Sequence, residues 1–310
     1  MKGSRSSRLY LFLIILCIVL GGCSRNSGEE PEGVADKAET APLQSSGVQK
    51  LVFHSEALDR DMRLSVYLPA GYNASQRYPV LYFIHGYGSL ETDIFDGLNL
   101  QQNAERLIEA GQIEPLIIVA PQMDNSYGLN TAANPGDPTS PGGERYEDYL
   151  VKDVVEYTDT HFNTLAERGS RYIGGISMGG FISLHSAFLH SDVYSRVGGH
   201  SPALFLDDWS AAGGANGLVQ FLYPTEALRQ ERDPLLLAQK RDLKNLSVYL
   251  DCGSGDSYRF FEGAEQLYTL LKSKGVPVEY HFRAGQHDGD YWMSHMDEYL
   301  KFYAERMEGS

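Results

Sequence analysis

Cysteine is scarce in this chain of 310 residues, which contains only three. Cys17 lies inside an apolar run near the N-terminus, and the other two are Cys23 and Cys252. Because Cys23 has a separate predicted role, described below, we expect no disulfide bond within the folded chain. Cys252 is interpreted as a small buried residue and not as a nucleophile.

Basic residues are also few. The chain has 26 Lys and Arg residues against 41 Asp and Glu residues, which gives a formal net charge of −15 at pH 7. Nucleic-acid binding requires a basic face, so the sequence predicts no nucleic-acid partner. The sequence has neither the Cys and His spacing of a zinc site nor a glycine-rich phosphate loop. We therefore expect no metal ion and no cofactor.

Long hydrophobic runs are confined to residues 9–20, which follow three basic residues and lead into Leu-Gly-Gly-Cys at 20–23. A basic start, a short apolar segment and small residues before a cleavage point are typical of an export signal. The run is short for a membrane-spanning helix. The ending looks like a bacterial lipoprotein signal, which implies that residues 1–22 are removed and that Cys23 carries a lipid. The alternative is an uncleaved anchor or cleavage elsewhere, and in either case we expect an exported domain.

Residues 23–47 are polar and rich in Ser, Gly, Pro and Glu, so they cannot bury enough apolar surface to fold. We interpret this segment as a disordered tether between the lipid and the domain. Residues 48–310 are numerous enough for one domain with a full core. The predicted location is therefore the bacterial cell envelope outside the cytoplasm, with the lipid as the contact to the membrane.

The order of expected elements predicts an α/β fold. Expected strands lie near residues 49–54, 63–68, 79–84, 115–120, 171–175, 195–199, 246–251 and 277–283. Expected helices lie near residues 99–110, 147–161, 178–190, 257–273 and 290–306. Such alternation predicts a mostly parallel sheet with helices on both faces and a site at the carboxyl ends of the strands. The segments 122–145 and 204–232 are interpreted as loops that shape a substrate pocket or simply cover the surface.

The most informative motif is Gly-x-Ser-x-Gly at residues 175–179, between an expected strand and an expected helix. A nucleophilic serine at a tight strand-to-helix turn needs small residues two before and two after it. Gly175 and Gly179 meet this requirement around Ser177. The N–H of Met178, at the start of the helix, is then available to a developing oxyanion.

An acid and a histidine should follow the serine in the chain if the motif is catalytic. Asp256 lies on a glycine-containing loop after the expected strand 246–251, and we favour it as the acid over its rival, Asp251, at the strand end. His287 follows the last expected strand and has both the order and the position of the general base. His200 precedes the acid in the chain, and we expect it to line the pocket instead.

The second oxyanion donor is expected on an early loop. Residues 79–88 read as a buried strand that ends in a His-Gly turn. In such sites one N–H comes from the residue after the nucleophile and one from the loop after an early strand. Met178 and Tyr87 are therefore the candidate donors, both through the main chain. We expect His85 to organise the loop and not to act as a second base.

These motifs together resemble the esterase family that includes feruloyl esterases, S-formylglutathione hydrolases, enterochelin-type siderophore esterases and mycolyltransferases. The resemblance covers roughly residues 48–305 and is greatest to feruloyl esterase modules of xylan-degrading enzymes. It is carried by the segments 67–72, 78–86, 115–121, 146–150, 174–180 and 250–253, with Asp256, the His287-Asp288 pair and Trp292.

The resemblance implies an α/β-hydrolase fold with Ser177, Asp256 and His287 as the catalytic triad. It also implies that the N–H groups of Tyr87 and Met178 form the oxyanion hole. We expect substrate contacts from His200, Ser201 and Trp292. The sequence departs from the family pattern at Gly289 and Asp290 and in the long segment 204–232.

The function predicted from the sequence is hydrolysis of carboxylic esters, with plant cell-wall feruloyl or acetyl esters as the first substrate class. The alternatives are a siderophore trilactone substrate or transfer of the acyl group to an acceptor other than water. An alternative of another class is a lipoprotein that uses a hydrolase scaffold only to bind. An intact set of nucleophile, base and acid argues against that alternative, because a binding protein needs none of them.

Overall fold

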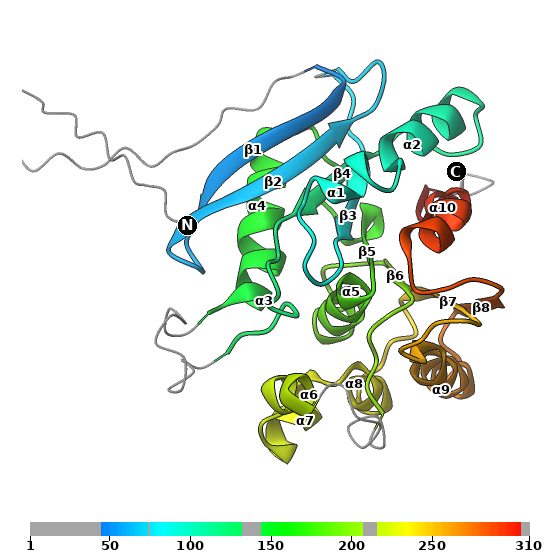
Figure 1. Cartoon of the computed structure of the whole chain (residues 1–310). Helices are drawn as coiled ribbons and strands as arrows, with labels where there is room; N and C mark the ends of the chain where they lie inside the picture. The colour runs from blue at the N-terminus through cyan, green and yellow to red at the C-terminus, as the bar shows by residue number, and fades with distance from the viewer. Residues whose placement is uncertain (1–44, 74, 132–143, 207–215, 305–310) are drawn as a thin grey trace, which may run out of the picture. The chain divides into compact units, whose positions relative to one another are not determined.

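An eight-stranded sheet organises the computed structural model, which describes residues 45–73, 75–131, 144–206 and 216–304. The strands are β1 (Gly47–Ser55), β2 (Arg60–Leu68), β3 (Val80–Ile84), β4 (Ile117–Pro121), β5 (Arg171–Ile176), β6 (Arg196–His200), β7 (Ser247–Gly253) and β8 (Val278–Arg283). Their order in the sheet is β1-β2-β4-β3-β5-β6-β7-β8 (Figure 1). The pairs β1–β2 and β2–β4 are antiparallel and all others are parallel. The prediction of a mostly parallel sheet is confirmed.

The burial of the strands follows their place in this order. Every residue of β3, β4 and β5 is buried, as expected of central parallel strands that are covered on both faces. The edge strands differ, because β1 mixes buried and exposed positions and β8 has no buried residue. The Gly-x-Ser-x-Gly motif therefore begins on a strand at the centre of the sheet.

The helices complete the fold. The α-helices are α1 (Asp93–Asp96), α2 (Leu100–Glu109), α3 (Tyr146–Asp148), α4 (Val155–His161), α5 (Met178–Leu189), α6 (Asn216–Leu222), α7 (Glu226–Arg232), α8 (Pro234–Lys240), α9 (Phe260–Ser273) and α10 (Gly289–Ala304). A π-helical turn, Tyr149–Val154, joins α3 to α4, and a 3-10 turn, Arg168–Ser170, precedes β5.

Two hydrophobic cores lie on opposite faces of the sheet. One core contains side chains of α1, α2 and α10, and the other contains side chains of α5, α8 and α9. The spacing of the buried residues explains each amphipathic helix: α2 buries Leu100, Ala104 and Leu107, which recur at helical intervals. Helix α5 is buried almost all round because it packs against β5, β6 and α8.

The segment 204–232 differs from the expected loop. It contains two short helices, α6 and α7, and α8 follows directly. Thr225 begins α7 by accepting the N–H of Leu228 at 3.2 Å, and Asp233 begins α8 by accepting the N–H of Leu235 at 2.9 Å. Helices of seven residues bury too few apolar side chains to show a clear periodicity, so the sequence pattern did not indicate them.

The expected helix 147–161 is also modified, because the π-helical turn divides it. The predicted signal 1–22, the predicted lipid attachment at Cys23 and nearly all of the predicted tether 23–47 lie outside the described residues. Among the residues that are described, no helix combines the length and the apolar character needed to cross a membrane.

Candidate active site

Ser177 occupies the turn between β5 and α5. Its backbone has φ 53° and ψ −113°, a strained conformation for a residue with a side chain. Three main-chain hydrogen bonds hold it there. Its N–H donates to the carbonyl of His200 at 2.9 Å, and its own carbonyl accepts the N–H of Ala203 at 3.0 Å and that of Phe181 at 3.1 Å. The turn therefore presents the Ser177 hydroxyl away from its own main chain.

The two glycines of the motif are required by close packing against β3. A side-chain carbon at Gly175 would lie 2.5 Å from the carbonyl oxygen of Ile84, and one at Gly179 would overlap the same atom. Larger residues at either position would push the turn away from the sheet. This is the physical reason for small residues two before and two after Ser177.

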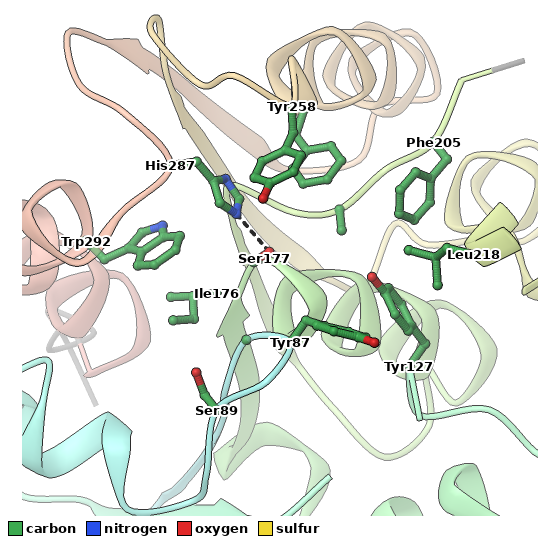
Figure 2. A pocket seen from close by; sticks show the side chains of 13 residues that line it. Tyr87, Ser89, Tyr127, Ile176, Ser177, Phe205, Leu218, Tyr258, His287 and Trp292 are labelled. Atoms are coloured by element: carbon green, nitrogen blue, oxygen red, sulfur yellow. Dashed lines mark hydrogen bonds between the residues drawn. The ribbon is translucent and has the colours of Figure 1, made fainter. Parts of the chain in front are cut away.

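The side chains of Ser177, His287 and Asp256 form a continuous hydrogen-bonded chain. The Ser177 hydroxyl lies 2.8 Å from Nε2 of His287, and Nδ1 of His287 lies 2.9 Å from Oδ2 of Asp256 (Figure 2). Asp256 comes from the loop between β7 and α9, and His287 comes from the loop between β8 and α10. Because a carboxylate only accepts hydrogen bonds, Nδ1 of His287 carries the proton and donates the hydrogen bond to Asp256. Nε2 is then free to accept the proton of Ser177.

The surroundings of this hydrogen-bonded chain restrict the side chains of Asp256 and His287. The side chain of Asp256 is fully buried, and its second oxygen accepts the N–H of Tyr258 at 2.8 Å. Three aromatic rings, those of Tyr258, Phe260 and Trp292, stand edge-on to the His287 ring with centroids 5.0–5.3 Å apart. The imidazole therefore has little freedom to turn away from Ser177.

Asp251, the rival acid, lies elsewhere. Its side chain is fully buried and bonds to Nδ1 of His200 at 3.0 Å and to the hydroxyl of Tyr299 at 2.7 Å. The structure therefore brings Asp256, and not Asp251, to His287.

The candidate oxyanion donors flank the nucleophile. Met178 is the first residue of α5, and the N–H groups of a first helical turn have no acceptor inside the helix. On the other side, the loop after β3 passes so close that a side-chain carbon at Gly86 would lie 3.7 Å from Cβ of Ser177. Gly86 and Tyr87 both line the cavity that Ser177 faces.

His85 organises the loop after β3, as expected. Its Nδ1 lies 2.8 Å from the carbonyl oxygen of Gly86, and its Nε2 lies 3.0 Å from the main-chain nitrogen of Met123. Only an unprotonated nitrogen accepts an N–H, so the ring is neutral with its proton on Nδ1. Burial lowers the pKa of His85 below its ordinary value, in agreement with a neutral ring.

A cavity of about 320 Å³ opens at Ser177 (Figure 2). Its wall is mostly apolar and aromatic and consists of Gly86, Tyr87, Ser89, Tyr127, Ile176, Ser177, Ala203, Phe205, Leu218, Tyr258, Phe260, His287 and Trp292. Figure 2 shows Ser177 between Trp292 and Ile176 on one side and Tyr127 and Phe205 on the other. Burial raises the pKa of Tyr127, and the nearby phenols Tyr87 and Tyr258 raise it further, so its hydroxyl stays neutral.

Of the three expected substrate contacts, only Trp292 lines the cavity. His200 and Ser201 are fully buried behind it. The His200 ring bonds to Asp251 and to the hydroxyl of Tyr303 on the α10 side of the sheet. Ser201 acts through Trp292, because its hydroxyl accepts the indole N–H at 3.2 Å.

Several lining residues were not identified from the sequence. Tyr258 and Phe260 follow Asp256 by two and four residues, and this proximity to the predicted acid was an available signal. Leu218 lies on α6, inside the segment 204–232 that was expected to shape a pocket or to cover the surface, but the residue itself was not singled out. Trp209 of the segment 204–232 lies outside the described residues.

Nothing in this site has the donor set of a metal centre. Across the described ranges, no group of three or more His, Cys, Asp or Glu side chains is arranged to hold a metal ion. The reactive groups that the described residues bring to the cavity are the Ser177 hydroxyl, its neighbouring imidazole and carboxylate, and main-chain N–H groups.

Comparison with known proteins identifies the family. The family model described as "Putative esterase" matches residues 55–303, which include the whole hydrogen-bonded chain and the cavity. The chain belongs to this esterase family. The resemblance inferred from the sequence motifs is confirmed at that level.

Individual relatives agree with the family. The chain is 32% identical over 167 residues to an endo-1,4-beta-xylanase/feruloyl esterase of Xylanibacter ruminicola, covering 52% of this chain and 22% of that protein. It is 21% identical over 265 residues to an acetyl esterase of Caldicellulosiruptor saccharolyticus, covering 79% of this chain and 93% of the relative. The solved structure of a ferulic acid esterase superposes with a TM-score of 0.70 at 23% identity, covering 84% of this chain and 98% of that one. This superposition confirms the α/β-hydrolase fold.

Proposed function

We propose that this domain hydrolyses carboxylic esters through an acyl-enzyme, with Ser177 as nucleophile, His287 as general base and Asp256 as the acid that orients it. The observation that carries the proposal is the hydrogen-bonded chain from Ser177 to Asp256 at the wall of an open cavity. Each member comes from a different loop, so their meeting is a property of the fold and not of local sequence.

The geometry supports the following steps. Oγ of Ser177 bonds to the ester carbonyl carbon while its proton moves to Nε2 of His287. The negative charge that develops on the carbonyl oxygen is stabilised by the N–H groups of Met178 and Tyr87. The bond to the alcohol then breaks, and the alcohol leaves with the proton from His287. Water attacks the acyl-enzyme by the same route, which releases the carboxylic acid and restores Ser177.

An aromatic acyl group, of the kind found in plant cell-wall feruloyl esters, is the proposed substrate class. The cavity is lined by Tyr127, Phe205, Phe260 and other aromatic side chains, which suit a planar ring. A volume of about 320 Å³ exceeds what an acetyl group fills. A relative is named as a feruloyl esterase, which supports the same choice, and another is named as an acetyl esterase, which makes acetyl esters the second candidate.

The test is a hydrolysis assay of the full chain beside Ser177→Ala. We expect turnover of nitrophenyl acetate, nitrophenyl ferulate and methyl ferulate. Because the two nitrophenyl esters share a leaving group, kcat/KM should be about tenfold or more higher for nitrophenyl ferulate than for nitrophenyl acetate. Ser177→Ala should lower kcat by about a thousandfold or more. Preference for acetyl over feruloyl would move the substrate class to acetyl esters, and the absence of turnover would refute the ester hydrolase.

Covalent labelling separates an enzyme from a binding scaffold. A fluorophosphonate probe reacts only with an activated serine, so we expect labelling of the unchanged chain and none of Ser177→Ala. Ligand binding without any labelling would favour the scaffold that only binds.

We also propose that the domain works outside the cytoplasm, held to the cell envelope by a lipid on Cys23. The N-terminal pattern of basic residues, apolar run and Leu-Gly-Gly-Cys supports this location. Metabolic labelling with a fatty acid should mark the protein and should fail in Cys23→Ala. Labelling that persists in Cys23→Ala would refute lipid attachment at this residue.

A further inference from the structure

The peptide group that carries the Tyr87 N–H has little side-chain packing to hold it. The Tyr87 side chain is 61% exposed, and Gly88, with φ +75°, has no side chain at all. An N–H that is to meet an oxyanion must nevertheless keep a fixed direction before the substrate arrives. Hydrogen bonds to this loop therefore decide whether the donor is preorganised.

Two of these hydrogen bonds act on the peptide itself. The carbonyl of Gly86 and the N–H of Tyr87 belong to the same planar unit and point in opposite directions. Nδ1–H of His85 donates to that carbonyl at 2.8 Å, and the N–H of Ser89 donates to it at 3.2 Å. The carbonyl end of the Gly86–Tyr87 peptide is thus held by two residues of its own loop.

The peptide that follows Tyr87 is held by a different segment of the chain. Oδ1 of Asn125, 37 positions later in the sequence, accepts the N–H of Gly88 at 2.7 Å. This distance is shorter than either contact to the Gly86 carbonyl. Because Gly88 is the residue after Tyr87, this bond fixes the Tyr87–Gly88 peptide plane. The peptide planes on both sides of the Tyr87 Cα are therefore held by hydrogen bonds. The side-chain atom that accepts an N–H must be the carboxamide oxygen, so its orientation follows from chemistry.

Asn125 is itself held in a well-anchored turn. The same turn supplies the N–H of Met123 to His85, and the hydroxyl of Ser126 closes it by donating to the carbonyl of Met123 at 2.7 Å. Ser126 also accepts the N–H of Gly128 at 3.0 Å. Tyr127 of this turn lines the cavity, so one segment contacts both the oxyanion loop and the cavity wall.

We infer that Asn125 is a positioning residue of the oxyanion hole: its carboxamide oxygen orients the Tyr87 peptide by holding the N–H of Gly88. The inference rests on the proposed ester hydrolysis. Asn125 does not line the cavity, so it acts through the loop and not on the substrate. Its loss should therefore weaken stabilisation of the transition state and leave binding of the ground-state ester almost unchanged.

The test replaces the carboxamide by an apolar group of similar size. In the full chain, Asn125→Leu should lower kcat by about tenfold or more with KM nearly unchanged, since removal of a whole oxyanion donor costs about a hundredfold or more. The rate of fluorophosphonate labelling should fall in parallel, because the phosphoryl oxygen occupies the same hole.

Asn73→Leu is the matched control. Oδ1 of Asn73 also accepts a main-chain N–H, that of Ser75 at 3.0 Å, but it lies before β3, at the opposite end of the strand from the oxyanion loop. This variant should keep kcat and labelling rate. If kcat and the labelling rate fall in both variants, or if Asn125→Leu keeps both at the level of the unchanged chain, the inference about Asn125 is overturned. The proposed ester hydrolysis would still stand in either case. Absence of turnover and labelling in the unchanged chain would overturn the proposed function and this inference with it.

Discussion

The indole of Trp292 stands at 82° to the imidazole of His287, with ring centroids 5.1 Å apart. The indole N–H donates to the hydroxyl of Ser201 at 3.2 Å, so the ring that confines the base is itself held from behind. Ser201 is thus linked to His287 through the indole, although it does not line the cavity. An edge-to-face aromatic contact contributes about 0.5–1.5 kcal/mol, which is enough to bias the orientation of the imidazole.

Two substitutions of Trp292 should therefore distinguish the effect of its aromatic ring from the effect of its hydrogen bond to Ser201. Trp292→Phe keeps an aromatic edge near His287 and should retain most of kcat, whereas Trp292→Leu should lower kcat by roughly tenfold. Steady-state kinetics on a nitrophenyl ester measure both. Equal kcat in the two variants would mean that the aromatic contact does not orient the base.

The two buried aspartates should respond in opposite ways. Asp256→Asn presents an amide to His287, stabilises the wrong tautomer and should lower kcat by about a thousandfold or more while the fold stays intact. Asp251→Asn disturbs a fully buried pair with His200 and should lower the free energy of unfolding by about 1–3 kcal/mol with only a small change in kcat. Denaturant melts beside kinetics measure both effects. A large loss of kcat in Asp251→Asn alone would reverse the assignment of the acid.

Leu218 should determine how large an acyl group fits. Its side chain lines the cavity from α6, so Leu218→Ala should raise the kcat/KM ratio of bulky over short acyl esters by up to about tenfold. Val219 is the control, because it is the next residue on α6 and does not line this cavity. A series of nitrophenyl esters of increasing chain length is the measurement. The same change of ratio in Val219→Ala would assign the effect to the helix as a whole.

Glu147 should make stability depend on pH in the acid range. Burial acts to raise its pKa, but hydrogen bonds from His185 and His190 outweigh burial and lower the pKa to about 2 from an ordinary value of 4.5. A folded-state pKa below the unfolded one stabilises the fold above pH 4.5, and the contribution disappears as the pH falls from 4.5 toward 2.

Glu147→Gln is the corresponding variant. It should be less stable than the unchanged chain at pH 7, and the difference should shrink as the pH falls below 4.5. Urea unfolding at a series of pH values measures this difference. A difference that stays constant down to the acid limit would show that the charge of Glu147 is not responsible.

Gly174 should tolerate no side chain while Tyr303 is present. A side-chain carbon at Gly174 would overlap the hydroxyl of Tyr303, which bonds to Nε2 of His200 at 3.0 Å. Gly174→Ala should lower the free energy of unfolding by about 1–3 kcal/mol. Tyr303→Phe removes the nearer of the two overlapping atoms and leaves the ring carbon Cζ at 2.6 Å, so the double variant should be partly relieved and more stable than the sum of the two single effects predicts. Simple additivity would show that the hydroxyl is not the obstacle.

The sequence predicted those parts of the site that depend on chain order and local turn chemistry. The glycines around Ser177 and the order of Ser177, Asp256 and His287 are such features, and the structure brings these three side chains together. The parallel sheet followed from the alternation of strand and helix patterns.

Other features had no local signal. Residues 197–200 of β6 are all buried, so no alternation of burial could indicate that the His200 ring lies behind the cavity. The helix that carries Leu218 is seven residues long, which is too short for a periodic pattern. Asn125 is an ordinary exposed loop residue until its partner, 37 positions earlier, is known.

The edge strand β8 has a consequence for how the activity would be lost. No residue of β8 is buried, it pairs only with β7, and the loop that carries His287 follows it directly. Local opening is easiest where few apolar contacts hold a segment. We therefore expect that fraying of this one strand would move His287 away from Ser177 while the central strands stay folded. On heating, the proposed hydrolysis should be lost before the centre of the sheet melts, because the position of His287 depends on the edge of the sheet.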